Sequence, residues 1–151
     1  MIYIYYTYLS EENHEKLLKN HLTAFPEQYQ EKIKKYKRWQ DAQLSLLGRL
    51  LLFKGVEEIE GVNLYDQEIK YTKHNKPYFE NSLIRFNISH SGEIAVCALS
   101  YECEIGIDIE IMEDIEIDDF KFQMTKKERD KIFASINKKN HFLIIGHKKK
   151  P

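Results

Sequence analysis

The strongest constraint on the fold is a series of three short apolar runs between residues 86 and 110. The run at 86–91 (Phe-Asn-Ile-Ser-His-Ser) leads into Gly92, and further runs follow at 94–99 and 105–110. Because glycine adopts positive φ at little steric cost, Ser91-Gly92 between two β-prone runs predicts a tight hairpin. The third run predicts a third strand, so we expect a small antiparallel sheet.

The third run also carries two acidic residues, Asp108 and Glu110. In a strand they share one face, about 7 Å apart at ~3.3 Å per residue. Two oxygen ligands at that spacing suit one Mg²⁺, which takes one or two protein carboxylates and completes its shell with water and substrate phosphate. In the alternative interpretation the isoleucines face the core and the acids simply face solvent. The spacing alone leaves both interpretations open.

The two motifs together, Phe-Asn-Ile-Ser-His-Ser-Gly at 86–92 and Gly-Ile-Asp-Ile-Glu at 106–110, resemble the signature of the surfactin-type 4'-phosphopantetheinyl transferases. The resemblance implies an α/β (α+β) half-domain with a small antiparallel sheet packed on a long helix. It also implies a holo-acyl-carrier-protein synthase-like enzyme. Such enzymes use Mg²⁺ to transfer the phosphopantetheine arm of coenzyme A to a serine of an acyl or peptidyl carrier protein, releasing 3',5'-ADP.

The resemblance assigns roles to individual residues. Asp108 and Glu110 match the metal ligands at the catalytic centre. His90 matches the residue that contacts the 3'-phosphate of coenzyme A, and Ser89 lies beside the nucleotide. Lys76, in Asn-Lys-Pro, matches a phosphate-binding Gly-Lys-Pro turn, and Lys32 falls where the family has another basic residue near the phosphates.

Two departures from the family pattern stand out. Leu44 occupies a position where many members carry arginine, so we expect one phosphate contact to be missing. Members also consist of two similar halves with the active site between them, and the second half has a Trp-x-x-Lys-Glu-Ala helix. The printed sequence reaches Pro151 without that motif. Read in another frame with suitable synonymous codons, residues 143–151 give Asp-Tyr-Trp-Thr-Gln-Lys-Glu-Ala.

We therefore hypothesise a frameshifted or truncated product. It would comprise an N-terminal transferase half at 1–111 and the truncated start of a second half at 112–151. An unpaired half would expose an apolar face, which predicts self-association.

Three other functions are alternatives. In the first, the chain is a non-catalytic remnant that at most binds coenzyme A. In the second, it is a metal-dependent phosphodiesterase that uses the same Asp-x-Glu pair. The phosphodiesterase interpretation leaves the Ser-His-Ser-Gly turn unexplained. A Ser-His hydrolase is disfavoured because Ser91 and His90 are strand neighbours that face opposite ways, and no nucleophile elbow surrounds them.

Composition narrows the partners. The 151 residues are 42% hydrophobic with three prolines, which predicts one folded domain rather than disorder. A net charge of -1 gives no overall attraction to nucleic acid or membrane, so an anion site must be local, for example among Lys32, Lys34, Lys35 and Lys37. Two cysteines form no disulfide framework or metal pattern, and no run is long enough to span a membrane. We expect a cytoplasmic protein.

Local patterns predict the remaining elements. Ser10 is expected to cap a helix through Leu17 and Leu18, and Pro26 to begin a second helix. A third helix from about Gln40 to Glu60 is expected to end at Gly61. The other expected elements are a strand at 2–9, a strand at 68–72 with a turn at 74–77, an acidic loop at 113–119 that is solvated or a second metal site, and a helix from Thr125 to about 136 with a capping box to Glu128.

Overall fold

The computed structural model describes residues 1–62, 69–74, 76–80, 82–111, 122 and 124–134. It forms two compact units, 1–111 and 112–151. Their assignment as the two halves of a transferase stays a prediction. The acidic loop at 113–119 and the frameshift hypothesis at 143–151 concern residues outside the described part of the chain.

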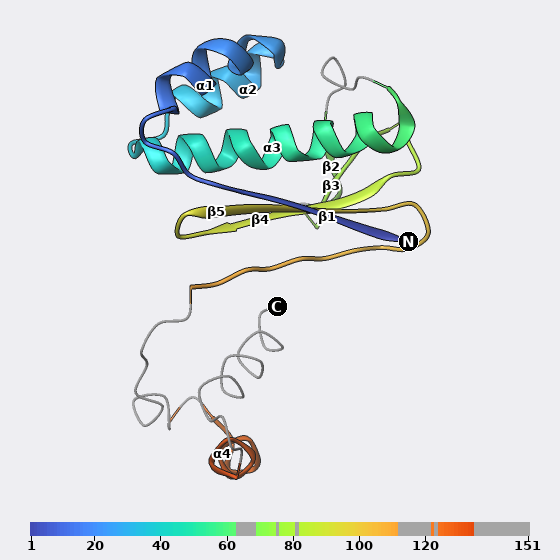
Figure 1. Cartoon of the computed structure of the whole chain (residues 1–151). Helices are drawn as coiled ribbons and strands as arrows, with labels where there is room; N and C mark the ends of the chain where they lie inside the picture. The colour runs from blue at the N-terminus through green and yellow to red at the C-terminus, as the bar shows by residue number, and fades with distance from the viewer. Residues whose placement is uncertain (63–68, 75, 81, 112–121, 123, 135–151) are drawn as a thin grey trace. The chain divides into compact units, whose positions relative to one another are not determined.

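The first unit is built on a three-stranded antiparallel sheet with one long helix across a face (Figure 1). The sheet has the order β1 (Ile2–Tyr8), β5 (Ile94–Ser100), β4 (Arg85–Ser91). The helices are α1 (His14–His21), η1 (Leu22–Ala24), α2 (Glu27–Lys34) and α3 (Trp39–Glu60), and a small separate hairpin consists of β2 (Lys70–Tyr71) and β3 (Pro77–Tyr78). Helices α1 and α2 pack on α3 away from the sheet. The predicted mixed α/β fold is confirmed.

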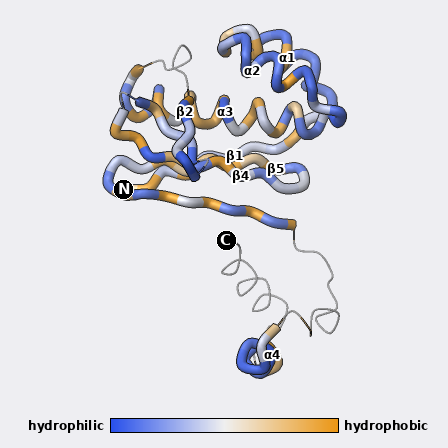
Figure 2. The backbone as a smooth tube through the Cα atoms, turned by 180° about the vertical axis from the view of Figure 1, so that it is seen from behind, coloured by the Kyte–Doolittle hydropathy of each residue, from blue (hydrophilic) through white to orange (hydrophobic). Residues whose placement is uncertain are grey.

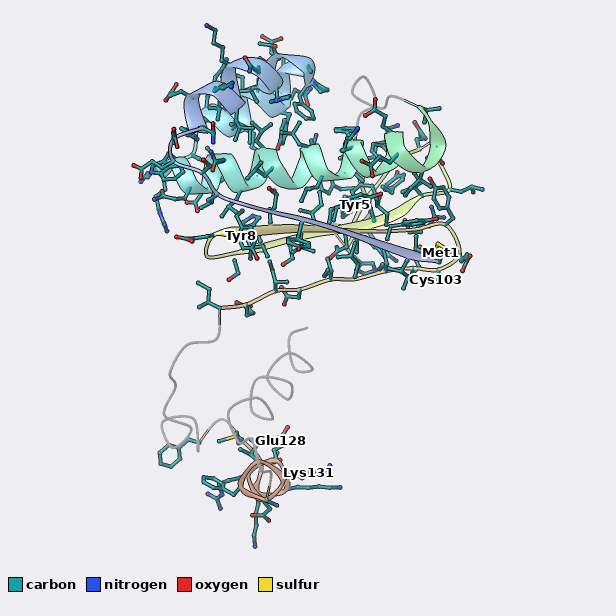
Figure 3. The ribbon with its side chains drawn as sticks, in the orientation of Figure 1. Met1, Tyr5, Tyr8, Cys103, Glu128 and Lys131 are labelled. Atoms are coloured by element: carbon teal, nitrogen blue, oxygen red, sulfur yellow. The ribbon has the colours of Figure 1, made fainter. Side chains whose placement is uncertain are left out.

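Helix α3 approaches the sheet closely through two glycines seven residues apart. A Cβ at Gly48 would lie 2.6 Å from Cγ2 of Ile88, and one at Gly55 would lie 2.7 Å from Cε2 of Tyr5. Figure 3 shows Tyr5 between the sheet and α3. The helix then ends as predicted at Gly61, which caps it with a left-handed φ of 68°.

Strand β5 is buried at every residue except its first. Residues 95–100 are all buried, because β5 is the central strand and both of its faces are covered. Burial raises the pKa of the Cys97 thiol to about 12, so this thiol stays protonated and unreactive. The predicted hairpin between β4 and β5 is confirmed, with Gly92 at a φ of 57° in its turn.

The third strand predicted at 105–110 is wrong in form. Residues 104–111 are extended but pair with no strand in the described structure. They run along the face of the sheet that α3 leaves open (Figure 1). The segment is held instead by side chains of β4. Their oxygens accept hydrogen bonds from its backbone amides: Asn87 from Ile107 at 3.0 Å, Ser89 from Ile109 at 3.2 Å and Ser91 from Ile111 at 3.2 Å.

This side-chain ladder explains the error in the prediction. Side chains of alternate strand residues point out of the plane of the sheet, so a partner that binds them lies on the face and not at the edge. The predicted alternation holds as far as residue 110. Ile105, Ile107 and Ile109 are half-buried and Asp108 and Glu110 are exposed, but Ile111, which was expected to face inward, is exposed as well. Figure 2 shows hydrophobic and hydrophilic residues alternating along this segment.

Three helix starts differ in how well the sequence predicted them. Helix α1 begins at His14, so Ser10 does not cap it; the Ser10 backbone is instead bound by the buried Gln43 amide at 2.8 and 2.9 Å. Pro26 directly precedes α2. In the second unit, α4 (Lys126–Phe133) has the predicted capping box between Thr125 and Glu128.

One face of β1 is apolar and exposed. Its outward side chains are Ile2, Ile4, Tyr6 and Tyr8, which are 55 to 62% exposed. Self-association through an apolar face stays a prediction. Among the described residues, no helix combines the length and apolarity that a membrane crossing requires.

We predict that Gly55→Ala destabilises the protein. Alanine favours a helix by about 1 kcal/mol over glycine, but its methyl group would collide with Tyr5 and Leu99, and overpacking of this kind costs about 1–3 kcal/mol. Urea denaturation measures the net loss. Gly106→Ala is the control, because a Cβ there meets open space. A Gly55→Ala variant more stable than the parent would contradict the close packing of α3.

The ladder predicts a local effect for each of its donors and acceptors. Ser89→Ala should cost about 1 kcal/mol of protection at the Ile109 amide, which is roughly fivefold faster hydrogen exchange. Asn87→Ala and Ser91→Ala should act in the same way on Ile107 and Ile111. The hydrogen-exchange rates of all three amides, measured by NMR in each variant, provide the control, because each substitution should affect its own amide. An equal rise at all three amides in every variant would argue against individual rungs.

Candidate functional site

The two carboxylates of the extended segment lie on one side of it. Asp108 and Glu110 alternate with half-buried isoleucines and are both exposed. Ser89 joins the pair to the sheet, because its hydroxyl donates to Oδ1 of Asp108 at 3.1 Å and accepts from the Ile109 amide at 3.2 Å. Thus the structure brings together Ser89 and Asp108, two residues that the sequence analysis assigned to different roles.

The chemistry of this pair suits Mg²⁺. Magnesium prefers oxygen ligands and takes only one or two protein carboxylates, leaving room for water and phosphate. Two exposed carboxylates at alternate positions of an extended segment provide that donor set. Within the described part of the chain, no three His, Cys, Asp or Glu residues form a group that could hold a metal ion.

A second feature of the unit is a basic hollow on the other face of β4. Two adjoining cavities of about 490 and 320 Å³ share Lys32 of α2 and Arg49 of α3 in their lining. His90 of β4 lines the smaller one, and Glu27 lines the larger one. The structure therefore brings Lys32 and His90 together, although they are far apart in the sequence.

Arg49 is a residue of this hollow that the sequence analysis did not assign. Its guanidinium lies 3.9 Å from the centre of the Tyr29 ring, a cation–π contact. Tyr29 is itself fixed, because its hydroxyl donates to the Ser45 carbonyl at 2.8 Å. Burial raises the pKa of Tyr29, so the ring stays a neutral phenol. The available signal in the sequence was a lone arginine in an apolar helix, one residue after Gly48.

Lys76 lies elsewhere. It lines a different cavity of about 470 Å³ together with Arg85 and Glu104. Its ammonium forms an ion pair with Glu104, and Arg85 Nε binds the same carboxylate at 2.9 Å. The Lys76 hydrogen bond and the two positive charges lower the pKa of Glu104. Since Glu104 begins the extended segment, this cluster ties one end of the segment to β4 and to the residue that precedes β3.

Strand alternation explains how the candidate residues are divided. Ser89 and His90 are neighbours on β4 and therefore face opposite sides of the sheet. Ser89 lies with Asp108 beneath the sheet, and His90 lies with Lys32 and Arg49 on the helix side. A ligand that reached both groups would have to pass around the edge formed by β4.

Comparison with known proteins identifies the family. A family model described as 4'-phosphopantetheinyl transferase, N-terminal, matches residues 12–102. That range includes Lys32, Lys76, Ser89 and His90 and ends before the two carboxylates.

Three curated relatives are similar to part of the chain. The 4'-phosphopantetheinyl transferase gsp of Aneurinibacillus migulanus is 41% identical over 85 residues, which are 55% of this chain and 34% of the relative. A 4'-phosphopantetheinyl transferase of Bacillus subtilis is 32% identical over 98 residues, 64% of this chain and 43% of the relative. The L-aminoadipate-semialdehyde dehydrogenase-phosphopantetheinyl transferase of Mus musculus is 34% identical over 85 residues, 52% of this chain and 28% of the relative.

The matched part of the chain thus spans less than half the length of each of these relatives. The family model, by contrast, covers more than half of the chain itself. On this ground, the chain belongs to the 4'-phosphopantetheinyl transferase family and matches its N-terminal domain.

Proposed function

We propose that this chain provides the coenzyme A and Mg²⁺ sites for transfer of 4'-phosphopantetheine to a serine of an acyl or peptidyl carrier protein, with release of 3',5'-ADP. The observation that carries the proposal is the hydrogen bond from the Ser89 hydroxyl to the Asp108 carboxylate, together with the bond that the same hydroxyl accepts from the Ile109 amide. The next residue of β4, His90, lines the basic hollow, which supports a metal site and a phosphate site close to each other.

The reaction is a displacement at the β-phosphorus of a pyrophosphate. Most of its catalysis comes from positioning and from neutralising negative charge. Asp108 and Glu110 would hold the Mg²⁺, and the bound ion would neutralise charge on the pyrophosphate oxygens. Ser89 keeps Asp108 oriented through its hydrogen bond to Oδ1.

The basic hollow suits the other end of coenzyme A. Lys32 and His90 come from α2 and β4 and line the same cavity, so both side chains can contact one phosphate. We assign the 3'-phosphate to this cavity. Lys76 would reach phosphate only by leaving Glu104, so we expect it to contribute less than Lys32 or His90.

The proposal is tested by incubating the chain with coenzyme A, Mg²⁺ and an apo carrier protein and measuring the carrier's mass. We expect a gain equal to the phosphopantetheine arm. Asp108→Ala should slow that gain by roughly a hundredfold or more, because several kcal/mol of charge stabilisation depends on the ion. Asp130→Ala, an exposed aspartate of α4, is the matched control and should leave the rate unchanged.

Two other outcomes are informative. Coenzyme A binding by calorimetry without any mass gain would reduce the function of this chain to that of a binding module. Neither binding nor mass gain, from a chain with a folded spectrum, would contradict the proposal.

A further inference from the structure

We infer that Arg49 binds the 3'-phosphate of coenzyme A in the basic hollow, together with Lys32 and His90. This inference rests on the proposed function. It adds a specificity-determining residue to the site, one that distinguishes coenzyme A from its analogue without the 3'-phosphate.

The position of Arg49 is the first argument. It is common to the linings of both adjoining cavities, as is Lys32, and the smaller cavity also includes His90. Three basic side chains from α2, α3 and β4 thus border one connected space. Among the described residues that line it, Glu27 is the single acid. An excess of positive charge around a hollow favours an anionic ligand there.

The state of the Arg49 side chain is the second argument. Its guanidinium carbon lies over the Tyr29 ring, 3.9 Å from the ring centre, and among the described residues it forms no ion pair with a carboxylate. A guanidinium carries its five N–H donors in its plane. When it contacts a ring through its flat face, the donor edge can bind a phosphate bidentately.

The ring also prepares the arginine for binding. Tyr29 is buried and held by the Ser45 carbonyl, so the ring that Arg49 contacts is in place before any ligand arrives. Less rotational freedom is then lost on binding.

Leu44 and Arg49 lie on different faces of α3. Leu44 is buried in a separate apolar cluster with Leu47 and Ala95, so it lies away from the hollow. Ser45 and Arg49, one helical turn apart, line the smaller cavity instead. Arg49 therefore offers this chain a cation on the face of α3 that meets the ligand.

Calorimetry with coenzyme A and with dephospho-coenzyme A tests the inference on the full chain. Arg49→Gln should weaken coenzyme A binding roughly tenfold, while the affinity for dephospho-coenzyme A changes by less than about twofold. Arg49→Lys should lose less, because it keeps the charge but not the planar fork. Lys54→Gln, on the same helix outside these cavities, is the matched control and should bind like the parent.

The alternatives separate this inference from the proposed function. Unchanged coenzyme A binding by a folded Arg49→Gln variant would overturn the role of Arg49 and leave the proposed function standing. An equal loss for both ligands would also overturn it, since Arg49 would not then recognise the 3'-phosphate. If the parent chain binds neither ligand, the proposed function fails, and the inference fails with it. If Arg49→Gln does not fold, the same comparison of coenzyme A with dephospho-coenzyme A is made on Arg49→Lys.

Discussion

The candidate site depends on the hydrogen bonds between three β4 side chains and the backbone of the segment at 104–111. Asn87, Ser89 and Ser91 stand at alternate positions of the strand and accept from every second amide of the segment. Each bond contributes only about 1 kcal/mol, but the three together fix the register. A shift by one residue would turn Asp108 and Glu110 toward the sheet and the isoleucines toward solvent.

The same strand also separates two kinds of chemistry. Because neighbouring side chains on a strand face opposite sides, Ser89 serves the carboxylates and His90 serves the basic hollow. Opposite charges that lay on one face would neutralise each other. Their separation across β4 keeps an acidic pair suited to a cation and a basic hollow suited to a phosphate within one small unit.

Local patterns were sufficient where a physical effect is local. The glycine cap at Gly61, the tight turn at Gly92 and the Thr125 capping box depend on a few neighbouring residues, and all three were predicted. The segment at 105–110 was predicted as a strand because alternation records which side chains are buried, not what the backbone amides bind. The family resemblance had assigned Lys32 and His90 to phosphate. The place of Arg49 in their hollow depends on three distant segments, and the Lys76 pairing with Glu104 spans 28 residues, so no local pattern predicted either of these two contacts.

We propose that Asp108 and Glu110 form a cation site in this chain. Titration with Mn²⁺ in the presence of coenzyme A, followed by paramagnetic broadening of backbone amide signals, tests this most directly. We predict that the amides at 107–111 and at Ser89 broaden first, and that Mg²⁺ restores their signals by competition. Broadening that begins instead in the acidic sequence at 113–119, with 107–111 unaffected, would contradict a cation site at Asp108 and Glu110.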